Sequence, residues 1–182
     1  MRRKLVTLGL LAALLLGVLA PMCVGRASAA APAAPVATPA QTRAAVLDKT
    51  RFLAHAGIAF FIIHHEYSRY KQGYFSAGTP GRTRHLIFAA AALAIALHEA
   101  KVAYGIAQKS NSKTLHALAA PFATLGATID SIRAKFAKGQ GDPAALAQLN
   151  STTGTINSTA GSDGFGTIKD VSPPAGVMPS GA

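Results

Sequence analysis

The sequence predicts an all-α fold: a small bundle of three longer antiparallel helices plus a short fourth, with flexible N- and C-terminal segments. Apolar residues recur at steps of three and four over three long stretches, which is the spacing of one helix face. Breaks rich in Gly, Pro or Ser separate these stretches. The 182 residues are enough for one domain, and alanine supplies much of the apolar content because only 7% of residues are aromatic.

Residues 1–29 are expected to form a secretory signal peptide. A basic start is followed by an apolar stretch over residues 5–20 and by the A-x-A pattern Ala27-Ser28-Ala29. We expect Sec-type export with cleavage between Ala29 and Ala30, which places the protein outside the cell or at a bacterial envelope. An uncleaved membrane anchor is the alternative, although the apolar stretch is short for a membrane span. Cleavage removes four basic residues and Cys23, so the mature chain is less basic than the formal net charge of +11 indicates and has no thiol.

Residues 30–41 alternate Ala with Pro and are expected to form an extended linker. The helical domain is then expected to occupy residues 42–160. Its first helix is predicted to begin after Thr42, a good N-cap residue, and to run to about Lys71. The apolar face of this helix is formed by Val46, Leu53, Ala56, Phe60, Ile63, Tyr67, Tyr70 and Tyr74. Glycines and a proline between residues 73 and 81 predict a turn after it.

The second helix is predicted from Arg82 or Thr83 to Lys109. Its apolar arc is broad, which indicates burial on more than one side. The third helix has apolar residues at strictly alternating steps of three and four: Leu115, Leu118, Phe122, Leu125, Ile129, Ile132 and Phe136. Pro121 lies inside this run, so either the helix is kinked there or it begins near Ala119.

The pair Asp142-Pro143 is typical of a helix start and predicts the short fourth helix. Its docking side is expected to contain Leu146, Leu149 and Ile156. Residues 161–182 are rich in Gly, Ser, Thr and Pro and are expected to form a flexible tail.

Six histidines are the candidate chemistry of the chain, and two of them precede a glutamate. An antiparallel hairpin of the first two helices places His55 level with His98, and it places Glu99 level with Ala54 and near Arg51. A metal ion or haem held by His55, His98 and Glu99 is therefore one hypothesis. No two potential ligands lie three or four residues apart on one helix, which favours the alternative that these side chains hydrogen-bond one another or Arg51. Glu66 and Arg69 are interpreted as a surface ion pair.

The sequence contains no phosphate-binding loop, nucleophile elbow, zinc-protease motif or dinucleotide fingerprint. We therefore expect a protein that is not an enzyme and needs no cofactor, with an interaction or structural role outside the cell. The expected partner is a protein or an anionic envelope component, and nucleic acid is not expected. The alternatives are the metal- or haem-binding bundle and an amphipathic helical hairpin that associates with a membrane surface.

Overall fold

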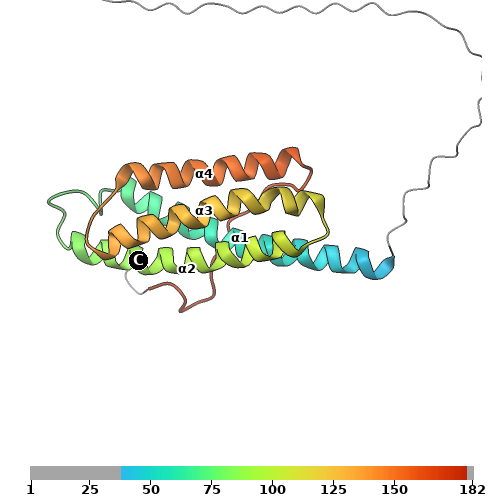
Figure 1. The fold of residues 1–182 in the computed structure, drawn as a ribbon. Helices are drawn as coiled ribbons and strands as arrows, with labels where there is room; N and C mark the ends of the chain where they lie inside the picture. The colour runs from blue at the N-terminus through green and yellow to red at the C-terminus, as the bar shows by residue number, and fades with distance from the viewer. Residues whose placement is uncertain (1–37, 180–182) are drawn as a thin grey trace, which may run out of the picture. The chain divides into compact units, whose positions relative to one another are not determined.

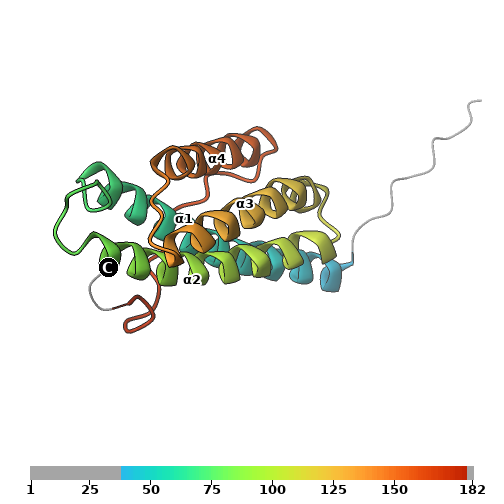
Figure 2. The same ribbon diagram turned by 60° about the vertical axis from the view of Figure 1, so that its left-hand side comes forward.

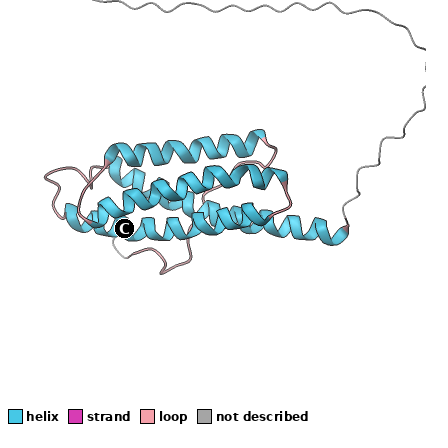
Figure 3. Ribbon diagram, in the orientation of Figure 1, coloured by secondary structure: helices cyan, strands magenta, loops and turns pink. Residues whose placement is uncertain are grey.

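The computed structural model describes residues 38–179, and this part of the chain is helical with no strand (Figure 3). The four helices are α1 (Pro39–Lys71), α2 (Arg82–Lys109), α3 (Lys113–Ala137) and α4 (Pro143–Ser162). Figure 1 shows them lying alongside one another: α2 packs on α1 and α3, while α4 packs on α3 and α1. The prediction of an all-α bundle is confirmed. The predicted signal peptide, its cleavage site at Ala29 and Ala30, and most of the predicted linker lie outside the described residues.

Helix α1 begins four residues earlier than predicted. Thr38, not Thr42, is its N-cap, and the Thr38 side chain and Gln41 form a reciprocal capping box. Pro39 occupies the first helical position, where the missing N–H of proline costs nothing. The last three residues of the predicted linker, 39–41, therefore belong to α1. Pro and Ala are compatible with the first turn of a helix as well as with an extended linker.

The predicted bounds of α2 agree with the structure, and Ser110 ends the helix in an extended conformation. Seven of its ten buried residues are alanines, which let the neighbouring helices approach closely. By length and composition α2 is the one helix among residues 38–179 that is suited to crossing a membrane, but half of its most apolar stretch is buried in the bundle. A helix at the core of a bundle has the same properties, so this is weak evidence for a membrane span.

Helix α3 continues through Pro121 and begins at Lys113, with Ser112 as its N-cap. Of the two arrangements considered for Pro121, the structure has the proline inside the helix. Helix α4 begins as predicted, with the Asp142 side chain accepting a hydrogen bond from the Ala145 N–H at 3.0 Å. The predicted apolar faces of both helices are buried in one core. The side chains that fill its centre include Phe52, Phe60, Phe122, Phe136, Leu125 and Ile129.

The segment after α4 returns across α1 and α4, as Figure 2 shows. Phe165 meets Phe52 edge to face with ring centres 5.4 Å apart, and Ile168 is 2% exposed. The Asn157 side chain accepts from the Ile168 N–H at 2.7 Å and donates to the Ile168 carbonyl at 3.2 Å. Residues 165–171, which composition alone placed in a flexible tail, therefore pack against the bundle.

Candidate functional site

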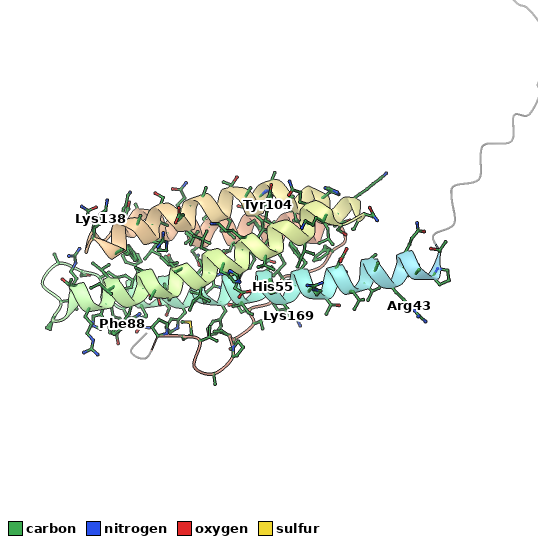
Figure 4. The ribbon with its side chains drawn as sticks, turned by 60° about the horizontal axis from the view of Figure 1, so that its bottom comes forward. Arg43, His55, Phe88, Tyr104, Lys138 and Lys169 are labelled. Atoms are coloured by element: carbon green, nitrogen blue, oxygen red, sulfur yellow. The ribbon has the colours of Figure 1, made fainter. Side chains whose placement is uncertain are left out.

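The predicted contact between His55 and Glu99 is present on the α1–α2 interface. His55 Nδ1 lies 2.5 Å from Glu99 Oε2, and the two side chains are 31% and 15% exposed. Figure 4 shows His55 beside α2. The antiparallel packing of α1 and α2 produces this contact.

His98 is not brought into this contact, because it is exposed on α2 while Glu99, the next residue, turns toward α1. Neighbouring residues on a helix point about 100° apart, so His98 and Glu99 do not face the same ligand position. Among residues 38–179, no group of three or more His, Cys, Asp or Glu side chains lies close enough to hold a metal ion. Of the hypothesised ligands, the described structure joins His55 and Glu99.

The contacts of His64 were not predicted. Its Nδ1 lies 2.8 Å from Asp170 Oδ2 on the tail, and its Nε2 lies 3.1 Å from the Thr153 hydroxyl on α4. That hydroxyl already donates its hydrogen to the Asn150 carbonyl at 2.7 Å, so it accepts from His64. His64 joins α1, α4 and the tail at one point.

The prediction of a surface ion pair between Glu66 and Arg69 is wrong. Glu66 is 0% exposed and Arg69 is 6% exposed, and Arg69 Nη1 lies 3.2 Å from Glu66 Oε2. Arg69 Nη2 donates to His85 Nδ1 at 3.1 Å, while the guanidinium lies 5.4 Å from the centre of the Tyr74 ring and 5.7 Å from that of Phe75. The aromatic residues Tyr74 and Phe75 of the α1–α2 loop lie against Arg69 and help to bury the pair. The i, i+3 spacing of Glu66 and Arg69 in the sequence does not indicate whether such a loop packs over them.

Burial raises the pKa of Glu66 to about 7, although the Arg69 guanidinium acts in the opposite direction through its charge and hydrogen bonds. Burial, with a smaller effect of Arg69, lowers the pKa of the neighbouring His65. His65 Nε2 is buried and has no hydrogen-bond partner among the described residues. Glu66 can therefore change its protonation near neutral pH.

A surface of different character occupies the other end of α1. We call residues 39–51 the α1 arm; they precede Phe52, the first buried residue of the helix, and extend past the bundle in Figures 1 and 4. Val46 is 59% exposed and Leu47 is 62% exposed, the two highest values among the large apolar side chains described. The arm and the α2–α3 loop line an open depression of about 830 Å³, whose lining includes Ala40, Ala44, Asp48, Asn111 and Ser112.

The basic residues of the α1 arm are Arg43, Lys49 and Arg51, and all three are exposed. Lys49 Nζ lies 4.7 Å above the Phe165 ring, which ties the base of the arm to the tail. Asp48 is the one carboxylate of the arm. The arm thus combines exposed apolar side chains with an excess of positive charge.

Comparisons of the chain with known protein families, with curated proteins and with solved structures found no match.

Proposed function

We propose that this chain is an exported helical protein that binds a component of the cell envelope or of the extracellular space, and that its role is binding and not catalysis. The α1 arm is the observation that carries the proposal. It presents Val46 and Leu47 to solvent at the end of a bundle whose other large apolar side chains are mostly buried. Adjacent exposed apolar side chains flanked by charge are typical of contact surfaces.

The physical state of the arm supports this role. Residues 39–51 form about three and a half helical turns, a length at which an isolated helix is marginal in water. The Thr38 capping box and the continuation into the packed part of α1 hold these residues helical. A partner that covers the arm buries apolar surface without first having to order the chain, which lowers the cost of binding.

The proposal is tested in two steps on the chain produced in its own cells. N-terminal sequencing of the exported protein is expected to find a start at Ala30, and a start at Met1 contradicts export with cleavage. A photo-crosslinking residue placed at Leu47 is then expected to capture an envelope component. The matched control places it at Ile87, which is 51% exposed on α2. Equal capture from both positions contradicts a binding role of the arm.

A metal- or haem-binding bundle is the second candidate, because the structure brings together two of its hypothesised ligands, His55 and Glu99. Elemental analysis and an absorbance spectrum of the exported protein test it. A stoichiometric metal or haem that is lost in His55→Ala and retained in His116→Ala supports this candidate, and a protein with neither contradicts it. His116 is the control because it is exposed at the start of α3.

A further inference from the structure

The exposed face of the α1 arm has a defined composition. Residues 43, 46, 47, 50 and 51 are spaced i, i+3, i+4, i+7 and i+8, so they share one helix face. These residues are Arg43, Val46, Leu47, Thr50 and Arg51, and all are exposed. An apolar pair therefore lies between two arginines one helical turn away on either side.

The positive charge extends beyond the arm to the adjoining loop. Lys109 and Lys113 flank the α2–α3 loop and are exposed, and the residues between them share a depression with the arm. Over the arm and this loop, five basic side chains stand against the one carboxylate of Asp48. The arm and the adjoining loop therefore carry an excess of positive charge, which favours an anionic partner.

A second copy of the chain is a poor occupant of this face. An antiparallel pairing centred on Val46 and Leu47 brings Arg43 of one copy against Arg51 of the other, and a parallel pairing brings each arginine against itself. The face has no acidic residue to offset this repulsion. Its charge is instead complementary to a negatively charged surface.

We propose that the α1 arm docks on an anionic phospholipid membrane surface, with Val46 and Leu47 entering the interface and Arg43 and Arg51 contacting the headgroups. This inference rests on the proposed binding role and names its partner. Basic side chains near an anionic bilayer attract it electrostatically, and arginine stems can lie along the apolar layer while their guanidinium groups stay at the headgroups. Apolar insertion together with basic contacts is the combination by which interfacial helices bind membranes.

The test is co-sedimentation of the exported chain with vesicles of equal parts phosphatidylglycerol and phosphatidylcholine, compared with vesicles of phosphatidylcholine alone. We expect binding to the anionic vesicles that weakens as salt is added. Arg43→Gln with Arg51→Gln should weaken binding by roughly 25-fold, because each basic side chain near such a surface contributes about fivefold. Val46→Ser with Leu47→Ser should weaken it as well, and circular dichroism checks that both variants remain folded.

The matched control is Arg84→Gln with Lys138→Gln, which removes the same charge from exposed positions at the other end of the bundle. It should bind the anionic vesicles within about twofold of the unchanged chain. Equal loss in the control and the arm variant, or no binding to anionic vesicles at all, overturns the lipid proposal. If vesicle binding fails while the residue at position 47 still captures an envelope protein in cells, the partner is an acidic protein surface and the proposed binding role stands. If both fail, the binding role of the arm falls too.

Discussion

The two ends of α1 differ in whether their charged side chains are exposed or buried. In the α1 arm, arginines and large apolar side chains are exposed together, with Leu47 62% exposed. Nineteen residues beyond Leu47, Glu66 is buried with Arg69 beneath the α1–α2 loop. A charged pair inside a core contributes little net stability and is costly to break, whereas an exposed arm contributes little to the fold and is free to bind. The contrast agrees with a structural role for the buried end of the helix and with the binding role that we propose for the arm.

The largest expected effect is the loss of the buried arginine. Arg69→Met leaves Glu66 buried without its cation, which should cost about 3–5 kcal/mol of unfolding free energy at pH 8. The matched control is Arg133→Met, because Arg133 pairs with Asp130 at the same i, i+3 spacing on an exposed surface. That change should cost no more than about 0.5 kcal/mol. Urea unfolding measures both, and equal losses would contradict the contrast between a buried and an exposed pair.

The pH dependence of stability should follow Glu66. Its pKa in the folded protein is about 7, above the usual value of 4.5, so folding favours the protonated carboxyl. The stability contribution of this group is therefore fully present below pH 4.5 and falls as the pH rises to 7, by about 3 kcal/mol. Glu66→Gln, which cannot ionise, should flatten this part of the curve. Urea unfolding between pH 4.5 and 8 provides the measurement, and an unchanged slope in the variant would show that other groups control it.

The middle of α1 is covered by the tail, and Gly57 marks the contact. A Cβ added at Gly57 would lie 2.5 Å from the Lys169 carbonyl oxygen and 2.6 Å from Val171 Cγ2. Gly57→Ala should therefore cost about 1–3 kcal/mol and speed amide exchange at Val171, whose N–H donates to the Gly57 carbonyl. Gly154→Ala is the control, because nothing lies within 4 Å of its added Cβ, and it should be neutral or slightly stabilising. A Gly57→Ala variant as stable as this control would show that the tail does not pack closely against α1 at Gly57.

The smallest expected effect on stability is in the arm itself. Leu47→Ala should change the unfolding free energy by no more than about 0.5 kcal/mol, because its side chain makes no core contact. Phe52→Ala, five residues on and fully buried, should cost about 3–5 kcal/mol. Thermal unfolding of the two variants compares them directly. A large loss in Leu47→Ala would mean that the arm is part of the folding core.

The bounds of α2 and the start of α4 were predictable because they depend on local signals. Gly81 and Ser110 bound α2, and Asp142 with Pro143 starts α4, so residue type alone located those ends. The antiparallel level of the two helices predicted that His55 lies near His98 and Glu99, and the structure joins His55 to Glu99. The orientation of His98 was not predicted, because neighbouring residues on a helix point about 100° apart.

Two parts of the site depended on packing that local sequence does not specify. The α1–α2 loop folds Tyr74 and Phe75 over Arg69, so an i, i+3 pair that is usually exposed becomes buried. The Asn157 side chain on α4 forms two hydrogen bonds with the backbone of Ile168, eleven residues further on in the tail. The composition of the tail resembles that of a linker and does not indicate this contact.

Amide exchange along α1 in the exported protein, with and without anionic vesicles, tests the functional contrast most directly. The account predicts that vesicles slow exchange in residues 39–51 and leave residues 62–71 unchanged. Unchanged exchange in the arm, or protection confined to the buried end of the helix, would contradict it.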